Sequence, residues 1–487
     1  MILNMENRDH KLSSVVLLIF IIFFCLITSF LILFDNYKPS YYNLLWLLPL
    51  VYLFFFIILF YMKKIFKYIG IILVASMYGV RMVIVPFVMY LGDYMTYGME
   101  QNYSNNMDSA LLLMCYELVF ILFFIIITTD KIYGDDESFY HNSNVMLKWE
   151  YTQRFKFVLL FLILYMIIIF IGTPGLIKES FFLTTGQSEE SAALYYSGEV
   201  SHRAFGLSFG KQLVTILFTV FWIIQVVLPP VLLTYMIKKI NNKTLRNITF
   251  IAVMILTLII CTETRAHSIE CAGAFTITTA IFYKNEIKIN YKLIIIIIMI
   301  VLSLGLSSKS KISTEDDNVL QSISVTLSAY CSGPNNIATA ITAVKESGEL
   351  NILKIIPDVL LQLPYLTLLF RPFFSGTSNT IFNQYVSMIS TGQIIPSIGM
   401  GYVYFGFLLS PLVPCFAVYC TMKFEKLSKK APDIIRKNLF ILAMIMMSRT
   451  TTTSNMLSGV TYLGHVFMTW GIIVFCYSKL TNQKTIK

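Results

Sequence analysis

The sequence predicts an all-α integral membrane protein, a polytopic bundle of about twelve transmembrane helices with a large outer loop that contains short helices. Hydrophobic residues make up 56% of the chain and charged residues only 13%, and the mean hydropathy is +0.71. Soluble domains carry about 25% charged residues. Apolar segments long enough to cross a bilayer also follow one another along the chain. The whole chain, 1–487, is therefore interpreted as a single integral membrane domain.

The predicted spans are apolar segments separated by polar or charged connections. The first of them lacks a small-residue cleavage site, so it is interpreted as a span and not as a cleaved signal peptide. In chain order the predicted spans cover 12–34, 41–62, 68–92, 109–129, 157–177, 212–237, 247–262, 269–283, 293–308, 399–422, 438–449 and 456–478.

The basic residues are distributed unevenly between the two sides of this bundle. Of the 37 Lys and Arg residues, 25 fall on the side that holds both termini, 11 fall on the other side, and Arg81 lies inside a span. Cytoplasmic connections of membrane proteins carry an excess of Lys and Arg. Both termini are therefore predicted to be cytoplasmic. The net charge of +10 is interpreted as a topology signal, and no nucleic-acid partner is predicted.

Two outer connections are long, 178–211 and 309–397. His202 and Arg203 come shortly before the sixth predicted span, and Arg371 lies late in the second loop. A guanidinium group binds phosphate oxygens bidentately. Both arginines are therefore candidate substrate contacts, with His202 beside the first. The alternative is that each arginine meets lipid headgroups at the rim of the bundle.

The hairpin 247–283 is short for two spans. Its 37 residues must cross outward and back, whereas two full spans need roughly 34–50 residues before any turn is counted. Its turn is therefore predicted to lie at or below the outer interface. Ionisable groups at that depth cost about 2.5–3.5 kcal/mol each, so they must pair, face water or bind a ligand. The turn contains Glu263, Arg265, His267 and Glu270.

Two other interpretations of this turn remain open. Arg265 could form a purely structural ion pair with Glu263 or with Glu270. If the second helix starts early, the two carboxylates and His267 share one helix face at positions i, i+4 and i+7, and such a set can bind a divalent cation. The favoured interpretation assigns no metal and no cofactor to the turn.

Two further arginines are given structural roles. Arg81 lies in the middle of a span, too far from the inner end to reach water, and is predicted to pair with Glu117 of the next span. Arg449 lies in the turn of the last hairpin, between Lys437 and Lys479. It is interpreted as a rim arginine that meets lipid headgroups.

Two short motifs carry a family resemblance. Thr264-Arg265-Ala266-His267 is similar to a Ser/Thr-x-Arg turn, and Pro396-Ser-Ile-Gly-Met-Gly-Tyr-Val-Tyr-Phe-Gly406 is similar to a Pro-Ser…Gly…Tyr…Phe-Gly segment with which a late span begins. Within it, Tyr402 could stack on a sugar ring. With about twelve spans, cytoplasmic ends and large outer loops, the chain resembles the Wzy-type polymerases of bacterial polysaccharide repeat units (O-antigen, capsule and exopolysaccharide).

The resemblance implies a glycosyltransferase of the bacterial cytoplasmic (inner) membrane that uses no nucleotide sugar and no cofactor. Such an enzyme transfers a growing glycan from undecaprenyl pyrophosphate onto a repeat unit linked to a second undecaprenyl pyrophosphate, at the outer membrane face. Its expected partners are these lipid-linked glycans, the surrounding membrane lipids, a flippase and a chain-length regulator.

The resemblance also implies roles for the ionisable residues. Arg265 would stabilise the charge that develops on the leaving pyrophosphate, with Arg203 and Arg371 in support. A base must take the proton of the acceptor hydroxyl as it attacks. That base would be one of the other ionisable residues of the turn, His267, Glu263 or Glu270.

Three other function classes are alternatives to this one. A flippase or transporter for lipid-linked glycans would show two related halves and no dominant outer loop, and the sequence contains no internal repeat. An O-antigen ligase shares the donor chemistry, and the sequence does not separate it from a polymerase. A membrane acyltransferase would use a histidine such as His267 or His465. The sequence contains no nucleotide-binding P-loop, so ATP-driven transport is not predicted.

Overall fold

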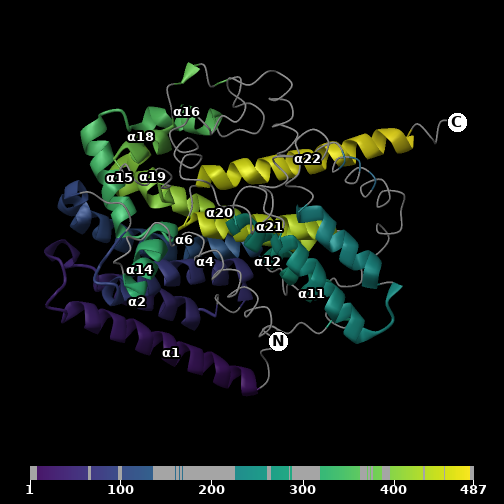
Figure 1. The fold of residues 1–487 in the computed structure, drawn as a ribbon, viewed down its shortest axis with the longest axis horizontal. Coiled ribbons are helices and arrows are strands. Elements are labelled where there is room, and N and C mark those ends of the chain that lie inside the picture. Colours follow the sequence, from purple (N-terminus) through teal and green to yellow (C-terminus); the bar gives the residue numbers. More distant parts are fainter. Residues whose placement is uncertain are drawn as a thin grey trace.

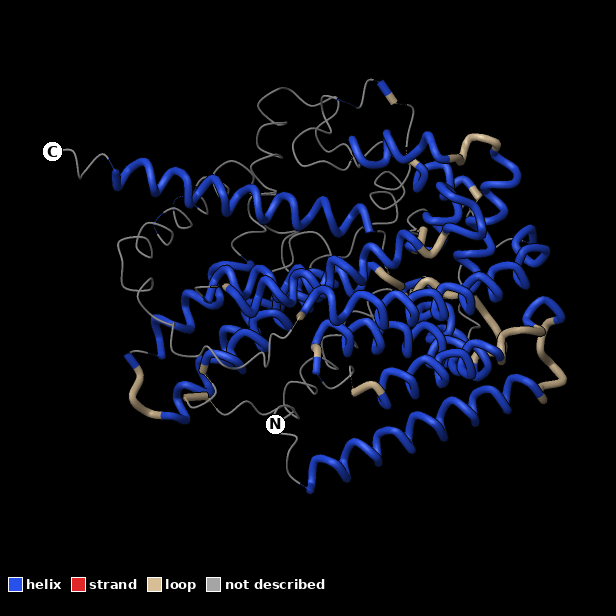
Figure 2. The backbone as a smooth tube through the Cα atoms, turned by 180° about the vertical axis from the view of Figure 1, so that it is seen from behind, coloured by secondary structure: helices blue, strands red, loops and turns tan. Residues whose placement is uncertain are grey.

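The structure of the chain is a computed structural model. It describes residues 8–63, 67–96, 101–134, 225–237, 239–259, 265–283, 286–287, 318–361, 373–374, 377–385, 395–431, 434–453 and 456–482, together with positions 160, 164, 167 and 370. Every regular element in this part of the chain is helical, and fifteen labelled α-helices form a bundle together with the helix Gln225–Ile237 (Figures 1 and 2). The predicted all-α class is confirmed for the described residues.

The helices of the N-terminal part are long and follow one another closely. They are α1 (Arg8–Leu33), α2 (Leu47–Tyr61), α4 (Ile69–Gly79), the π-helical turn η2 (Val80–Ile84), α5 (Val85–Leu91) and α6 (Met107–Tyr133), with short 3₁₀ turns η1 (Ser40–Tyr42) and η3 (Gln101–Asn106) before α2 and α6.

The rest of the described chain combines short and long helices. They are α11 (Lys243–Ile259), α12 (Arg265–Phe282), α14 (Val319–Tyr330), α15 (Pro334–Ser347), α16 (Ile355–Leu360) after the 3₁₀ turn η5 (Ile352–Lys354), α18 (Ser378–Gln384), α19 (Ser397–Leu409), α20 (Leu412–Lys430), α21 (Ile434–Thr450) and α22 (Met456–Asn482). A further apolar helix covers Gln225–Ile237.

Four described helical segments are long and apolar enough to cross a membrane, namely Val15–Leu33, Ser40–Tyr61, Ile69–Leu91 and Ser104–Tyr133, and a bent helix pair would make a fifth. The outward face of α1 carries Phe20, Phe23 and Phe30, all exposed, as expected for a helix that faces lipid. The chain therefore has the helices of a multi-pass membrane protein. The predicted spans 157–177 and 293–308 lie outside the continuously described residues, and the total of twelve stays a prediction.

The predicted span 399–422 contains a sharp bend that was not predicted. The chain forms α19 and α20 here, whose axes differ by 115°. Gly406 has φ 69° and ψ −170°, a conformation that only glycine adopts readily. Gly401 lies against the backbone of Ser410, where a Cβ atom would meet the carbonyl oxygen at 1.9 Å. The two glycines therefore allow the chain to double back at this bend.

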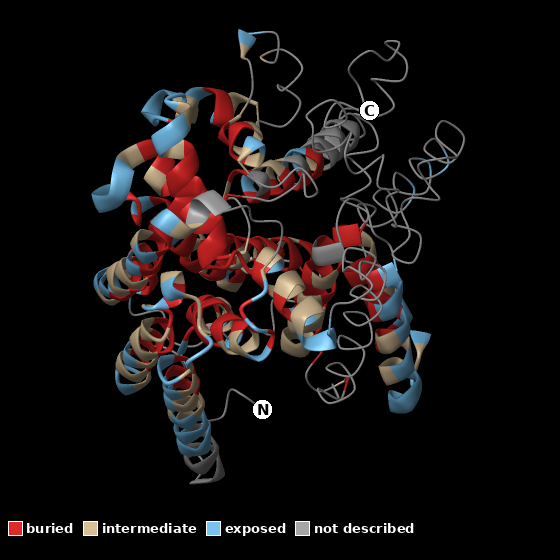
Figure 3. Ribbon diagram, turned by 60° about the vertical axis from the view of Figure 1, so that its left-hand side comes forward, coloured by how far each residue is buried: buried red, intermediate tan, exposed pale blue. Residues whose placement is uncertain are grey.

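Two large groups of buried apolar residues hold the bundle together. One joins α1, α2, α4, α5 and α6 to residues of α15, α19 and α20, and the other joins the helix Gln225–Ile237 to α11, α12, α21 and α22. Helices α20 and α21 pack against each other, with α20 also on α6 and α21 also on α12, so this pair connects the two groups. In Figure 3 the buried residues accordingly gather on the central helices.

The predicted pair of Arg81 and Glu117 is confirmed. Both side chains are 0% exposed, and Arg81 Nη1 lies 3.0 Å from Glu117 Oε2. The Tyr78 hydroxyl donates to Glu117 Oε1 at 2.7 Å, and Arg81 Nε donates to the carbonyl oxygen of Ser332 at 3.1 Å. Arg81 lies in the π-helical turn η2, just before Pro86, whose missing N–H interrupts the α-helical ladder.

Removing one member of this pair is expected to prevent stable folding. Arg81→Met leaves the Glu117 carboxylate buried without its counter-charge, a change that typically costs about 3–5 kcal/mol. The double variant Arg81→Met/Glu117→Gln should recover a large part of that loss. The measurement is the thermal midpoint and yield of monodisperse protein in detergent. Equal midpoints for wild type and Arg81→Met would refute the role of the pair.

The helix bend yields a second prediction. Gly401→Ala is expected to lower the thermal midpoint and the yield of folded protein, because no space exists for the added methyl group. Gly471→Ala, on α22, is the matched control, since nothing lies within 4 Å of its Cβ position. The control should be neutral or stabilising by up to about 1 kcal/mol. Equal stability of the two variants would show that α19 and α20 do not double back in this way.

Candidate functional site

The candidate site lies where the first turns of α12 meet the end of α21 and the adjoining turns of α22. Helix α12 begins at Arg265, four residues earlier than the predicted start at 269, so His267 and Glu270 are helical residues one turn apart. Helix α21 ends at Thr450, directly after Arg449. Helices α12 and α21 pack against each other along this region.

The centre of the site is an ion pair between Arg449 and Glu270. Arg449 Nε lies 2.7 Å from Glu270 Oε1, and the side chains are 19% and 6% exposed. Neither atom forms a well-directed hydrogen bond, and Glu270 Oε2 has no hydrogen-bond partner within the described ranges. The contact is thus a close charge pair with unused hydrogen-bonding capacity. Such a pair, held in a low-dielectric interior, is a source of specific chemistry or binding more than of stability.

His267 lies on α12 one helical turn before Glu270. Its ring contacts the ring of Tyr462 in a tilted arrangement, with centroids 4.3 Å apart and planes 32° apart. The Tyr462 hydroxyl in turn lies 3.6 Å from Cys271 Sγ. These contacts fix the imidazole against α22, one helical turn from Glu270.

Polar contacts from neighbouring helices hold α12 in register. Gln225 Nε2 donates to Ser268 Oγ at 3.0 Å and to the carbonyl oxygen of Thr257 at 3.1 Å. Farther along α12, Thr278 donates to Asn438 Oδ1 at 3.0 Å, and Asn438 Nδ2 donates to the carbonyl oxygen of Val226. Buried polar side chains in a helical bundle are satisfied across helices, so these bonds determine the position of the first turn of α12.

The turn that follows Arg449 is lined by buried hydroxyl groups. Thr450, Thr451 and Thr452 are all fully buried, and Thr452 Oγ1 has no hydrogen-bond partner among the described residues. The Ser397 hydroxyl, at the start of α19, donates to the carbonyl oxygen of Thr450. The structure therefore brings the start of the segment 396–406 to the Arg449 turn, beside the first turn of α12.

Several predicted site residues are not placed in this site. Arg265 is the first residue of α12, and its backbone alone is described. Tyr402 lies on α19 but packs against the apolar group of α1 to α6, so the structure does not bring it to His267 and Glu270. The remaining predicted residues, Glu263, His202, Arg203 and Arg371, lie outside the described residues.

The interpretation of Arg449 as a rim arginine was wrong, because its guanidinium contacts the buried Glu270. Glu270 accordingly has Arg449 as a charge partner, and the pairing with Arg265 considered from the sequence stays untested, because the Arg265 side chain lies outside the described part of the chain. The sequence contained an indication of this pairing. The predicted turns 261–270 and 448–455 both belong to hairpins that are short for two spans, and the first contains the acidic Glu270 whereas the second contains the basic Arg449. In the described part of the chain no three His, Cys, Asp or Glu residues form a metal-binding group, and the set with Glu263 is not tested.

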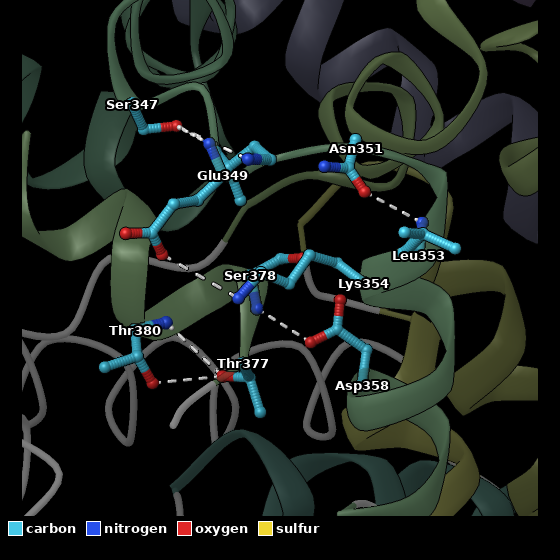
Figure 4. A network of polar contacts seen from close by, with 10 residues as sticks. Ser347, Glu349, Asn351, Leu353, Lys354, Asp358, Thr377, Ser378 and Thr380 are labelled. Carbon is cyan, nitrogen blue, oxygen red and sulfur yellow. Dashed lines mark hydrogen bonds and ion pairs between the residues drawn. The ribbon is translucent and has the colours of Figure 1, made fainter. Parts of the chain in front are cut away.

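A second polar network lies among the short helices of the segment 309–397 (Figure 4). Asp358, buried on α16, accepts the backbone N–H of Ser378 at 2.7 Å and the hydroxyl of Tyr404 at 2.6 Å. Asn351 and Thr377 accept backbone N–H groups at the starts of η5 and α18. These contacts cap helix N-termini, where carboxylate and hydroxyl oxygens are stabilising. The network is therefore structural, and it attaches α16 and α18 to α19.

The Arg449–Glu270 pair is expected to contribute to stability through coupling of the two charges. In a double-mutant cycle with Arg449→Met and Glu270→Gln, the coupling energy should exceed about 1 kcal/mol, because both groups are largely removed from water. Arg449→Met should be the more harmful single change, since it leaves the more deeply buried charge without its partner.

A matched control for this cycle is the pair Arg246–Glu286, whose atoms are 3.4 Å apart and whose side chains are 22% and 43% exposed. Exposed pairs contribute about 0–1 kcal/mol, so its coupling should be smaller. The measurement is thermal unfolding in detergent. Equal coupling in the two cycles would show that Arg449 and Glu270 are not held together inside the bundle.

The chain matches no protein-family model, no curated protein and no solved structure. The chemistry open to the site is that of its own side chains. A guanidinium group can bind and stabilise an anion, and a carboxylate or an imidazole can accept a proton. The imidazole of His267 and the carboxylate of Glu270 lie one turn apart on α12. The guanidinium of Arg449 lies at the end of the neighbouring helix α21.

Proposed function

We propose that this protein is a polysaccharide repeat-unit polymerase, a glycosyltransferase that uses a polyprenyl-pyrophosphate-linked donor. In this reaction a growing glycan leaves undecaprenyl pyrophosphate and is joined to a repeat unit on another undecaprenyl pyrophosphate at the outer membrane face. The observation that carries the proposal is the ion pair in which Arg449 Nε, near the end of α21, lies 2.7 Å from Glu270 Oε1, near the start of α12. The pair combines a cation and a carboxylate: Glu270 follows the motif 264–267 by three residues in the chain, and Ser397 of the motif 396–406 contacts the Thr450 carbonyl next to Arg449.

The proposed chemistry needs a cation for the leaving group. The bond between the anomeric carbon and pyrophosphate breaks, and negative charge builds up on the pyrophosphate oxygens. Arg449 is the described cation of the site, and its contact with Glu270 is made through Nε, which leaves the two terminal nitrogens of the guanidinium outside that contact. They can therefore donate to phosphate oxygens, in the geometry that guanidinium groups favour. Arg265, the first residue of α12, would be a second cation at the same end of the helix.

The acceptor hydroxyl needs a base at the moment it attacks the anomeric carbon. Glu270 contacts Arg449, and His267 lies one helical turn from Glu270 on α12, against Tyr462. When a pyrophosphate group binds the guanidinium, it competes with Glu270 for the same cation. The carboxylate then loses part of its stabilisation and becomes a better proton acceptor. In this scheme donor binding itself activates the base, and Glu263 is the other carboxylate proposed for the role.

The alternatives predict different products from the same substrate. A flippase or transporter for lipid-linked glycans would move them across a membrane without joining them. An O-antigen ligase would transfer the glycan to a different acceptor, and an acyltransferase would leave the number of repeat units unchanged. The apolar helical bundle and the charged turn are compatible with each of these classes. The similarity of both motifs to the Wzy-type segments favours the polymerase.

The test is a reaction of purified protein with undecaprenyl-pyrophosphate-linked repeat units alone, without nucleotide sugar or ATP. The expected product is a ladder of oligomers. Arg449→Ala should reduce the rate of ladder formation by about 10²-fold or more, as for loss of one donor to a developing anion. Arg449→Lys should restore little, because a point ammonium lacks the bidentate geometry.

The matched control is Arg436→Ala, which removes an arginine from the opposite end of the same helix, α21. It should retain most of the activity. Folded wild-type protein that yields no ladder from its own organism's repeat unit would refute the polymerase. Translocation without ladder formation would indicate the flippase, and a ladder made equally well by Arg449→Ala would remove Arg449 from the mechanism.

A further inference from the structure

The segment 318–344 is unusual for an outer loop, because none of its 27 residues is charged. It forms α14 and α15, joined by the tight turn at 331–333. The exposure of its residues follows a simple pattern. Asn318 and Val319 at one end and Lys345 and Glu346 at the other are exposed, whereas every residue from 331 to 343 is buried. The middle of the segment therefore lies inside the bundle, and its two ends lie at a surface.

The contacts of α14 show how the first leg of this segment runs. Gln321 Nε2 donates to Asp93 Oδ2 at 3.0 Å, and Ser324 Oγ donates to the carbonyl oxygen of Met95 at 2.7 Å. Both partners come just after α5. At the other end of the leg, the carbonyl oxygen of Ser332 accepts Arg81 Nε. Helix α14 thus packs antiparallel to α5, and the turn that follows it reaches Arg81 of η2, near the middle of the span Ile69–Leu91.

The contacts of α15 show the return of the chain. Helix α15 packs on α6 and η3, near which it lies in Figure 1. Asn106, which immediately precedes α6, donates through Nδ2 to Thr342 Oγ1 at 2.8 Å and accepts from Lys345 Nζ. Near the start of α15, Asn335 accepts the hydroxyl of Tyr42 at 2.7 Å. The second leg therefore ends at the level where α6 begins.

The depth of the turn follows from the helices on either side. Arg81 and Glu117, which meet near the turn, are 12 residues from Asp93 and 9 residues from Asp108. At a rise of about 1.5 Å per residue, these separations correspond to roughly 13–18 Å. The apolar core of a bilayer is about 30 Å thick. Because Asp93 and Asp108 flank the two spans, the turn 331–333 lies near the middle of the membrane.

We propose that residues 318–347 form a re-entrant hairpin, which enters the membrane on the side of the connection 92–106, turns at 331–333 and leaves on the same side. Each leg is a helix of 12 or 14 residues, too short for a full span of about 20 residues. Non-helical backbone at membrane depth is tolerated only where protein buries it, and residues 331–333 are buried. This hairpin replaces part of the large outer loop by a membrane-embedded element, independently of the proposed enzyme activity.

The surroundings of the exposed side chains of α14 distinguish a re-entrant hairpin from the alternative, in which the same segment covers the bundle outside the membrane. Ile323 and Tyr330 on α14 are exposed, Tyr330 by 49%, although Tyr330 is next to the turn. In a re-entrant hairpin these side chains contact acyl chains. In a lid outside the membrane they would contact water. The reactivity of a thiol at position 330 therefore decides between the two arrangements.

The test compares Tyr330→Cys with Val319→Cys, which replaces a residue that is 71% exposed at the other end of the same helix. A membrane-impermeant maleimide is applied to intact cells and, separately, to inside-out vesicles, with wild-type labelling as background and labelling in SDS as the total. Val319→Cys is expected to react from one side only. Tyr330→Cys is expected to react at least tenfold more slowly from both sides.

Reaction of Tyr330→Cys at the rate of Val319→Cys, from either side, would overturn the hairpin, as would a Val319→Cys protein that reacts from neither side. Tyr330→Trp provides a second readout that needs no thiol. Its fluorescence should be quenched by lipids brominated on their acyl chains and not by aqueous acrylamide, measured against wild type as background. Quenching by acrylamide alone would place position 330 in water and refute the proposal.

Discussion

The Arg81 guanidinium lies fully inside an apolar helical bundle, and the surrounding helices are arranged so that its charge is compensated. Removing an isolated charge from water costs several kcal/mol even after relaxation, so the position of Glu117 relative to Arg81 is narrowly defined. That pair connects η2 to α6, and the Tyr78 hydroxyl connects α4 to the same carboxylate. The remaining donor contact, from Nε to Ser332, reaches an element more than 200 residues away in the chain. A single buried cation therefore connects the N-terminal helices to the hairpin of α14 and α15.

A comparable electrostatic constraint operates in the C-terminal half. Arg449 and Glu270 are ionisable groups that lie largely out of contact with water, with side chains 19% and 6% exposed. Arg449 and Glu270 satisfy that constraint by approaching each other, at 2.7 Å. The two pairs differ in their surroundings. Glu117 also accepts the Tyr78 hydroxyl, whereas Glu270 Oε2 has no hydrogen-bond partner in the described part of the molecule. Both carboxylate oxygens of Glu117 are thus engaged, although Arg81 Nη2 has no hydrogen-bond partner among the described residues, whereas Glu270 retains an oxygen that could accept from a ligand.

Local chemistry predicted much of the fold. Long apolar runs predict membrane helices, because unsatisfied backbone groups are too costly in lipid, and the helices α1, α2 and α6 lie close to the predicted bounds. The Arg81–Glu117 pair was predicted because a charge in the middle of a span needs an opposite charge nearby, and Glu117 is the mid-span carboxylate of the next predicted span. The bend between α19 and α20 was missed. Composition alone treats 399–422 as one apolar run, and the conformation of Gly406 and the contact of Gly401 with Ser410 depend on how the chain folds back.

The sequence by itself determined that the chain is a membrane-embedded helical protein, where most of its helices lie, and that charges at 81, 117 and 261–270 needed partners. These properties depend on hydropathy and on the cost of isolated charge, both of which act on short segments. Only the tertiary structure decided which partner each charge takes. Arg449 and Glu270 are nearly 180 residues apart in the chain, and Ser397 reaches the Arg449 turn from a third segment. Contacts of this kind arise from helix packing, which side-chain type and spacing do not specify.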